Sequence, residues 1–353
     1  MECTRRGNIW FLILAAVVSC AVTVRNGWAA PEVAAPKPVR LLDAPVTADG
    51  RVPVRIGLAI TNLTEVDEAH EQFRVGGFAI ASWDDPRLTF NPRPGEKTRV
   101  YGQDQIWTPG FQLLNAAAPP TIQATIRVSP EGHVQYAGRF VATLSTKFGL
   151  RRFPFDYQDL QILVSPFTSG AVRIDLKADR QLTQLVRGPV LELEQWRLFG
   201  ISSYEQNLSV GGIFHLDQIE FRIHAQRRPT FYIWTIILPL SVMLLVAWST
   251  LWIAPSHFAQ QISITMPTFI SVIAFSYAMA FTLPRVPYLT FMNAYFLSIY
   301  LFVFLSVLEI VAIYRLRHSG KEPKAIALHR KARWFLPLSY LVLMGFIVLL
   351  FFT

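Results

Sequence analysis

Cysteine is almost missing from this chain, and so are the motifs of the common enzymes. Of 353 residues only Cys3 and Cys20 are cysteines, and both lie within the first twenty. No disulfide framework can therefore hold the core together. The sequence also has no His-Glu-x-x-His, Gly-x-Ser-x-Gly or Walker motif. Its seven histidines are scattered along the chain, which favours surface or hydrogen-bonded imidazoles over metal ligands. We therefore expect no enzyme, no metal site and no cofactor.

Acidic residues are scarce in the last third of the chain. Residues 229–353 carry 8 basic and 2 acidic groups, whereas residues 31–228 carry 22 and 21, so most of the net charge of +9 lies at the end. The nearly neutral middle segment offers no basic surface for phosphates, which excludes nucleic acid as a partner. Hydrophobic residues make up 52% of the chain and charged residues 16%. This balance exceeds what one soluble core needs and indicates a membrane protein.

The first thirty residues are typical of an export signal. A basic start is followed by an apolar core that is too short for a stable span, and then by small residues. Two cleavage sites compete, because Gly27–Ala29 fits a signal peptidase whereas Val17–Cys20 resembles a lipoprotein box that would leave Cys20 acylated. The first is favoured since secretory cleavage is the commoner fate. We expect residues 1–30 to form a signal peptide.

From about residue 39 to residue 228 the sequence repeatedly shows the period of two of half-buried strands. Turn clusters rich in glycine, proline and asparagine separate these segments, and no helical pattern lies between them. Short strands at this spacing predict an all-β, immunoglobulin-like sandwich that fills an exported domain of residues 31–228. The clearest alternating segments are residues 52–60, 73–81, 121–128 and 217–223.

Long apolar runs begin at Thr230, and four of them are long enough for a hydrocarbon core of roughly 30 Å. We therefore predict a four-helix transmembrane domain of residues 229–353. Its expected spans are residues 230–253, 258–283, 288–314 and 334–352.

Charge sets the orientation of these spans. The linker of residues 315–333 carries seven basic residues and one acid, so it should face the cytoplasm, and the C-terminus should lie on the outer side with the N-terminal domain. The pair Arg227 and Arg228 violates this rule on the exported side and requires its own explanation. Glu309 is the only acid within the spans, and we expect it to snorkel from its place near a helix end.

Six short motifs follow one another in a fixed order: Trp107–Gly110, Arg152–Asp156, Ser165–Phe167, Arg227–Trp234, Leu238–Leu240 and Leu283–Tyr288. Together they resemble the prokaryotic pentameric ligand-gated ion channels, the cysteine-free branch of the Cys-loop receptor superfamily, with the bacterial amine-gated channels as the nearest look-alike. The resemblance runs from about Val52 to the C-terminus. It implies a homopentamer in the lipid of a cell inner membrane, with the sandwich as a periplasmic ligand-binding domain. An agonist between adjacent sandwiches would open a central pore.

The second motif holds a proline between two aromatic residues. Pro154 fixes its own φ and restricts the residue before it, so Phe153 and Phe155 are held stiffly. In the family, the loop at this position rests on the membrane domain and two cysteines close it in animal members. The resemblance therefore implies that both rings press on the ends of the helices. In the alternative interpretation both rings belong to the sandwich core and Asp156 caps a turn.

Asp156, if it faces the membrane domain, requires a cation. Arg227 or Arg228 can supply one, and the guanidinium fork suits a bidentate pair with a carboxylate. Such a pair would also explain the two misplaced arginines. The resemblance adds coupling residues from the linker between the second and third spans: Pro284, Arg285 and Pro287.

The second span supplies the expected pore, whose lining follows from alignment on the motif that begins at Leu283. The lining residues are Ser263, Pro267, Ile270, Ala274, Tyr277 and Phe281, which keep to one helical face. Stacked apolar rings can close a pore by dewetting, so the gate candidates are Ile270, Tyr277 and Phe281. In the alternative interpretation this face is buried against the neighbouring spans. Pro267 departs from the family pattern, because proline inside a helix usually kinks it.

The cytoplasmic mouth of this span has Gln260 and Gln261 where cation-selecting relatives carry an acidic ring. The resemblance predicts a cation channel, but this chain lacks the acidic residue that usually selects cations at this mouth. Anion conduction or weakly selective conduction therefore stays open.

The resemblance places the agonist in a pocket of aromatic side chains, which belong to the complementary strands, the second principal loop and the capping hairpin. These residues are Phe78, Tyr136, Phe167, Tyr204 and Phe214. Each is also a candidate for ordinary core. Ser165 and Ala137 stand where the amine-gated channels have a carboxylate and an amide, so a primary amine is not expected, and gating by protons stays open. A non-conducting, membrane-anchored sensor is the rival function, although one anchoring helix would suffice for it.

Overall fold

The computed structural model describes residues 41–45, 50–167, 173–186, 194–210, 214–280 and 286–353, without the side chains of residues 208–210, 214–216 and 280. The expected signal peptide lies outside these ranges. So do three of the expected site residues: Phe281, Pro284 and Arg285.

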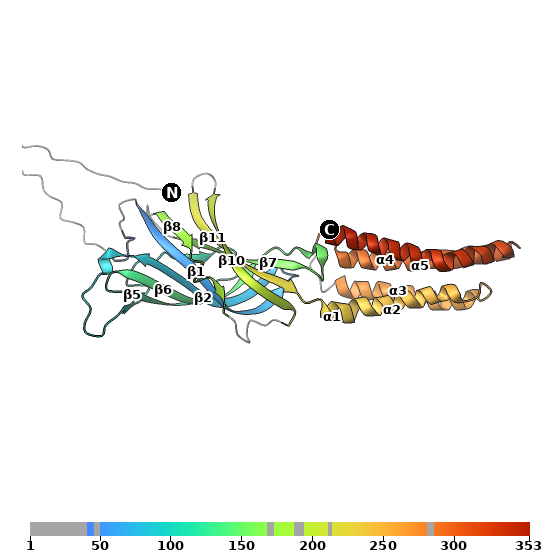
Figure 1. Ribbon diagram of the computed structural model, residues 1–353, viewed down its shortest axis with the longest axis horizontal. Helices are drawn as coiled ribbons and strands as arrows, with labels where there is room; N and C mark the ends of the chain where they lie inside the picture. The colour runs from blue at the N-terminus through green and yellow to red at the C-terminus, as the bar shows by residue number, and fades with distance from the viewer. Residues whose placement is uncertain (1–40, 46–49, 168–172, 187–193, 211–213, 281–285) are drawn as a thin grey trace, which may run out of the picture. The chain divides into compact units, whose positions relative to one another are not determined.

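Two sheets build the N-terminal domain (Figure 1). The larger sheet has the order β3-β5-β6-β2-β1-β8, with β9 paired to β1. Along its central strand β6, His133–Ser145, side chains from Val134 to Leu144 alternate between buried and more exposed positions, because successive residues point to opposite faces. The other strands of this sheet are β1 (Arg51–Asp67), β2 (Gln72–Asp84), β3 (Arg99–Tyr101), β5 (Thr121–Val128), β8 (Arg173–Ala178) and β9 (Gln184–Leu185).

The smaller sheet has the order β10-β11-β7-β4. Its strands are β4 (Phe111–Leu113), β7 (Tyr157–Pro166), β10 (Trp196–Val210) and β11 (Phe214–Arg227). Buried side chains from both sheets, among them Phe73, Phe140, Ile162 and Phe221, form one hydrophobic core between the layers. The expected strand-rich sandwich is thereby confirmed.

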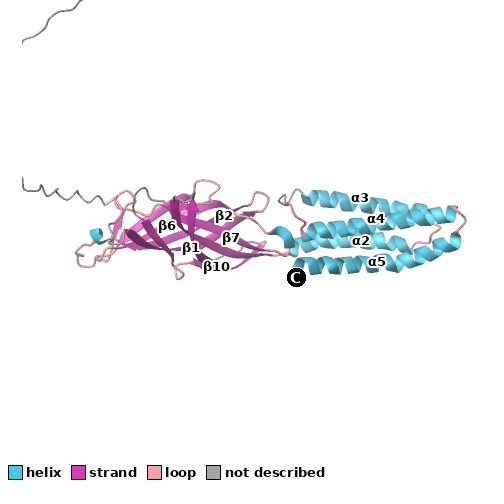
Figure 2. Cartoon of the chain, turned by 90° about the horizontal axis from the view of Figure 1, so that it is seen from above, coloured by secondary structure: helices cyan, strands magenta, loops and turns pink. Residues whose placement is uncertain are grey.

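Four helical segments in the described residues are long and apolar enough to cross a membrane: Thr230–Trp252, Phe258–Met279, Phe291–His318 and Glu322–Phe352. The first is composite, with α1 (Thr230–Tyr232), a π-helical turn (Ile233–Ile237), α2 (Leu238–Ser249) and a 3-10 turn (Thr250–Trp252). The others are α3 (Phe258–Ala280), α4 (Phe291–His318) and α5 (Glu322–Phe352). Figure 2 shows α2, α3, α4 and α5 side by side.

The helices extend beyond the expected spans at the basic linker. Helix α4 continues to His318 and α5 already begins at Glu322, so most of the basic residues that we expected in a linker lie on helix ends. At about 1.5 Å per residue the 31 residues of α5 reach some 46 Å, which exceeds a hydrocarbon core of roughly 30 Å. Hydropathy marks where a helix is apolar, and not where it ends.

Glu309 does not snorkel, and that expectation was wrong. Its carboxylate is buried between α4 and α5, where Oε1 lies 2.8 Å from Nδ1 of His329, which is also buried. A partner from the next helix binds one oxygen of this carboxylate inside the bundle, so the side chain is held there and does not reach the interface.

Candidate functional site

The proline turn lies between a 3-10 turn, Leu150–Arg152, and strand β7. Phe153 and Pro154 are buried, and the peptide bond between them is cis. The ring of Phe155 packs edge-on against Phe291 at the start of α4 and Phe352 at the end of α5, both at 5.8 Å between ring centres. Phe155 is therefore not sandwich core, because its ring partners belong to the helices.

Phe153 contributes to both domains. It belongs to the main hydrophobic core, as the alternative interpretation expected, but its ring also packs against Tyr232 of α1 at 4.7 Å. The two aromatic residues of the turn thus contact three helices between them. Packing takes the place that a disulfide would have in a loop with cysteines.

Asp156 pairs with Arg227, one of the two arginines that the sequence offers. The Nε atom of Arg227 donates to Oδ1 of Asp156 at 2.9 Å, and Nη2 donates to Oδ2 at 3.3 Å, which is the bidentate geometry that a guanidinium fork allows. Both residues are only 1% exposed. The side chain of Asp156 therefore does not merely cap a turn.

A second carboxylate, which sequence analysis did not predict, completes this site. Glu68 lies in the turn between β1 and β2, and its Oε1 accepts a hydrogen bond of 2.6 Å from Nη1 of Arg227. The same Nη1 donates to the hydroxyl of Tyr232 at 3.4 Å. We call Glu68, Asp156, Arg227 and Tyr232 the junction network. No local pattern marks Glu68, since its partner is 159 residues away in the chain.

Aromatic rings and two negative charges hold the guanidinium of Arg227. It lies 4.3 Å from the ring centre of Trp196 and 4.8 Å from that of Phe153. Burial alone lowers the pKa of Arg227, but the carboxylates of Asp156 and Glu68 outweigh burial and raise that pKa above its ordinary value. The charge of Arg227 is thus permanent, and its two carboxylate partners explain why an arginine stands at the end of β11, next to the first helix.

The linker between α3 and α4 makes its own contact with the sandwich. The hydroxyl of Tyr288 accepts a hydrogen bond of 3.1 Å from the backbone N–H of Leu150 and donates one of 3.4 Å to the carbonyl of Phe148. Sequence reasoning singled out Pro287, which is exposed, and missed the side chain that follows it. Tyr288 is the last residue of the motif Leu283–Tyr288, and this position was the only sequence feature that could have pointed to its role.

The expected pore face of α3 is exposed in the single chain. Ile270 is 65% and Tyr277 67% exposed, and Ser263, Pro267 and Ala274 are exposed as well. The opposite side of α3 packs against the rest of the chain through Gln261, Thr265, Thr268 and Val272. The alternative interpretation, in which the expected stripe is buried within the bundle, was therefore wrong for one chain.

The two glutamines at the start of α3 have different environments. Gln261 is buried, and its Nε2 donates to the carbonyl of Ile253 at 3.1 Å and to that of Thr250 at 3.4 Å. Gln260 is exposed. Of this pair, only Gln260 has a side chain that is free to face a pore.

The expected ligand residues separate into two groups. Phe78 of β2 and Tyr136 of β6 line one cavity of about 710 Å³ on the larger sheet. Burial raises the pKa of the Tyr136 phenol, which therefore stays a hydrogen-bond donor at neutral pH. Phe167 and Tyr204 belong to the side of the smaller sheet, are 64% and 45% exposed, and do not line this cavity. Phe214 lies in β11, and its side chain is outside the description. Of the four aromatics whose side chains are described, the cavity of one chain thus brings together only Phe78 and Tyr136.

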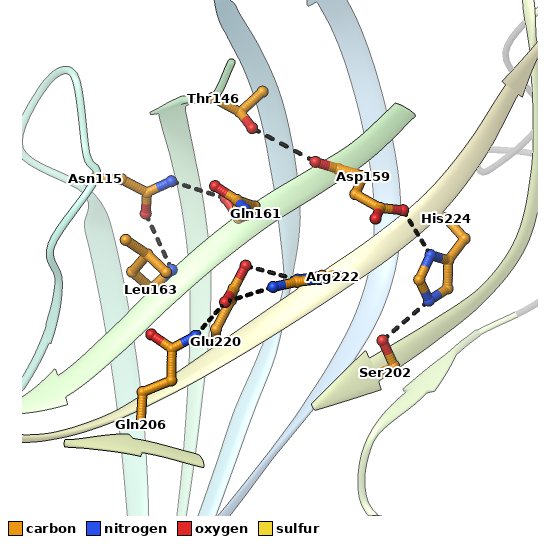
Figure 3. Close-up of polar contacts among 10 residues, drawn as sticks. All are labelled: Asn115, Thr146, Asp159, Gln161, Leu163, Ser202, Gln206, Glu220, Arg222 and His224. Carbon is orange, nitrogen blue, oxygen red and sulfur yellow. Dashed lines mark hydrogen bonds and ion pairs between the residues drawn. The ribbon is translucent and has the colours of Figure 1, made fainter. Parts of the chain in front are cut away.

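Polar side chains cover part of the smaller sheet (Figure 3). Asp159, His224 and Ser202 are linked by hydrogen bonds of 2.7 and 2.9 Å, a sequence of residue types that also occurs in hydrolases. Nearby, the buried Glu220 accepts from Arg222 and Gln206. The Asp159–His224 contact joins β7 to β11, and the Ser202–His224 contact joins β11 to β10, so these polar side chains connect neighbouring strands of the smaller sheet.

Comparisons with known proteins agree with this architecture. The family model described as the neurotransmitter-gated ion-channel ligand binding domain matches residues 41–229, more than half of the chain. The proton-gated ion channel of Gloeobacter violaceus is 28% identical over 311 residues, which cover 87% of this chain and 86% of that protein.

Animal receptors match over a smaller share of their length. The gamma-aminobutyric acid receptor subunit beta-4 of Gallus gallus is 26% identical over 272 residues, 74% of this chain and 55% of that subunit. The pH-sensitive chloride channel 2 of Anopheles gambiae is 24% identical over 261 residues, 69% of this chain and 42% of that protein. The expected likeness to amine-gated bacterial channels stays a prediction. With its strand-rich sandwich and its four apolar helices, the chain belongs to the pentameric ligand-gated ion channels, a family of membrane channels and not of enzymes.

Proposed function

We propose that five copies of this chain form a ligand-gated ion channel in a bacterial inner membrane, with the sandwich and the C-terminus in the periplasm. The observation that carries the proposal is the exposed stripe on α3. Ile270, Ala274 and Tyr277 leave apolar surface uncovered on a helix whose other side is packed, and one helix cannot enclose water. A ring of such helices covers the stripe and turns it into a pore lining.

Agonist binding between adjacent sandwiches follows from the separation of the aromatic residues. The cavity with Phe78 and Tyr136 belongs to the larger sheet, whereas Phe167 and Tyr204 belong to the side of the smaller sheet. A site that uses both groups requires two copies of the chain. Because one relative is a proton-gated ion channel, protons are a second candidate stimulus.

The junction network is the proposed route from the sandwich to the pore. Arg227 ends β11 and is followed at once by the first helix, so a movement of the sandwich that displaces Asp156 or Glu68 acts on that helix through one buried cation. Phe155 and Tyr288 add two contacts near the start of α4, through which the same movement of the sandwich reaches the helices. The expected coupling role of Phe153, Pro154 and Pro287 belongs to this proposal.

The resemblance predicts cation conduction, and the uncharged exposed side of α3 favours weak selectivity as the second candidate. Among the described residues of α3 none is charged, and Gln260 is the exposed residue where an acidic ring would stand. The reversal potential in asymmetric NaCl separates the two: a shift close to the Nernst potential of sodium supports the cation channel, and a shift near zero supports weak selectivity.

Recording from purified full-length protein in planar bilayers, with a screen of pH and small ligands, tests the channel. Wild type should elute as a pentamer and open in steps. A variant with Ile270→Ser and Tyr277→Ser should conduct without a stimulus, because polar rings stay wet. Leu341→Ser with Leu349→Ser, on the exposed side of α5, is the matched control and should behave as wild type. A monomer, or silence of both wild type and the pore variant, contradicts the proposal.

A further inference from the structure

The cavity on the larger sheet has a floor that strand pairing fixes. Phe78 of β2 lies opposite Arg139 of β6, which lies opposite Gln123 of β5. Four residues earlier in β6, Gln135 lies between Ser82 of β2 and Arg127 of β5 in the same way. Side chains in such cross-strand rows share one face of a sheet, so both arginines belong to one hollow.

The middle of this floor is apolar and low. Between the two rows lies a third, in which Ile80 faces Ala137 and Ala137 faces Thr125. Ala137 is the residue that replaces an expected amide. Its small side chain leaves space between the arginines, and together with Phe78 and Ile80 it offers an apolar bed inside the cavity of about 710 Å³.

One wall of the cavity is the segment between β8 and β9. The carboxylate of Asp179 accepts hydrogen bonds from the backbone N–H groups of Gln181 at 2.9 Å and Leu182 at 3.2 Å, so its charge is used to shape the wall. Leu182 lies so close to β1 that a Cβ on Gly57 would come within 2.5 Å of the Cβ of Leu182. The wall is thereby fixed against the sheet.

The net charge of the cavity is positive, because two arginines line it and only one acid does. Within the described residues, Arg127 and Arg139 have no hydrogen-bond or ion-pair partner, whereas Arg99, Arg222 and Arg227 each bind a carboxylate. His133, which also lines the cavity, is bound to Asp84 at 2.7 Å. Asp179 is the only acid among the residues that line the cavity, and its Oδ1 already accepts two backbone hydrogen bonds.

We propose that this cavity binds a small organic carboxylate and that this carboxylate is the agonist, an inference that rests on the channel function proposed above. The fork of Arg139 takes the carboxylate, and the apolar body of the ligand lies on Phe78, Ile80 and Ala137. Arg127, at the far end of the floor, favours ligands that carry a second acceptor. An ammonium ligand meets two guanidinium groups against a single carboxylate that already accepts two backbone hydrogen bonds, and is rejected.

Benzoate, benzamide and benzylamine, which share a ring and differ in charge, test this proposal by calorimetry on the full-length protein in nanodiscs at pH 7.5. Benzoate should bind, benzamide should bind at least about tenfold more weakly, and benzylamine should not bind. Arg139→Gln should weaken benzoate about tenfold or more, and Arg139→Lys less. Arg74→Gln removes a charge from the neighbouring strand β2, outside the cavity, and should change nothing. Arg127→Gln serves as a second variant if the first does not assemble.

The possible outcomes distinguish a failure of the proposed carboxylate site from a failure of the proposed channel function. Equal binding of benzoate and benzamide, or equal effects of Arg139→Gln and Arg74→Gln, overturns the carboxylate site even if protons open the pore. Specific benzoate binding that opens the pore, with both responses lost in Arg139→Gln, supports the whole proposal. Specific binding to a protein that conducts with other stimuli but not with benzoate overturns the agonist role. A protein that binds benzoate and never conducts contradicts the channel function and leaves the site.

Discussion

Removal of the charge of Arg227 tests the junction network most directly. In Arg227→Gln the carboxylates of Asp156 and Glu68 lose their cation, while Asp156 stays almost fully buried. Breaking a buried ion pair by removing one partner costs about 3–5 kcal/mol, because the other charge stays buried without compensation. The guanidinium also leaves the rings of Trp196 and Phe153, which adds up to about 2 kcal/mol for desolvated contacts.

The two carboxylates should matter unequally. Asp156→Asn keeps the shape of the side chain and leaves Glu68 to neutralise Arg227, so we expect a loss of about 1–3 kcal/mol. Glu68→Gln should cost less, since Glu68 is only half-buried and the bidentate pair remains. Chemical unfolding of the purified protein gives the order, and the concentration of stimulus at half-maximal current shows whether the same order governs gating.

Arg228→Gln is the matched control, because Arg228 is exposed and next in the chain. We expect it to stay within about 0.5 kcal/mol of wild type. Equal costs of Arg227→Gln and Arg228→Gln would refute the reasoning, and so would strict additivity of Arg227→Gln with Asp156→Asn, since residues in direct contact should couple. Exchange of the two charges, Asp156→Arg with Arg227→Asp, should restore function only in part, because Glu68 would then face an aspartate.

Substitutions at four further positions test other parts of the structure. Tyr288→Phe removes the acceptor for the N–H of Leu150 and should cost about 0.5–1.5 kcal/mol in unfolding and shift the stimulus response, whereas Phe291→Leu should alter the response through packing alone. Ile270→Ser alone should raise the current without stimulus, and a larger Ile270→Phe should lower it; the same current from both would exclude Ile270 as a gate. Partial burial raises the pKa of Asp67, but hydrogen bonds from His70 outweigh it and hold that pKa below its ordinary value. The contribution of this contact to stability is therefore complete above the ordinary pKa of Asp67 and is lost as the pH falls through the lowered one, so the stability difference between wild type and Asp67→Asn, followed by chemical unfolding, should shrink below about pH 4.

Periodicity and hydropathy were enough to predict the strand-rich sandwich and the four apolar helices, whereas the expected pore face of α3 came from the family resemblance. The contacts that depend on distant turns could not be predicted. A period of two follows from local geometry, and a span follows from the thickness of the bilayer, so both can be read from neighbouring residues. Asp156 could be matched with Arg227 because each was out of place alone. Glu68 was not out of place, since an acid in a surface turn needs no partner, and only folding brings it to Arg227.

Glu309 shows the opposite error. It was assigned to the interface because charges near the ends of spans usually snorkel. The hydropathy pattern ended the third span near Tyr314 and began the fourth at Trp334, so His329 was counted as linker and not as part of a helix. Helix formers such as Lys324, Ala325 and Ala332 continue α5 beyond its apolar part and place His329 opposite the acid.

The junction network also explains how a loop without cysteines can fix the sandwich to the helices. A disulfide across the loop would mainly restrict that loop itself and the unfolded chain. The cation of Arg227 instead joins four separate segments: the turn after β1, the proline turn, the end of β11 and the start of the first helix. Arg227 and Asp156 are almost fully shielded from water, so their opposite charges attract each other in a medium of low dielectric. This attraction opposes a shift of either side chain. Such a connection stabilises the contact and also makes each segment respond to the others, which a covalent bond within one loop does not.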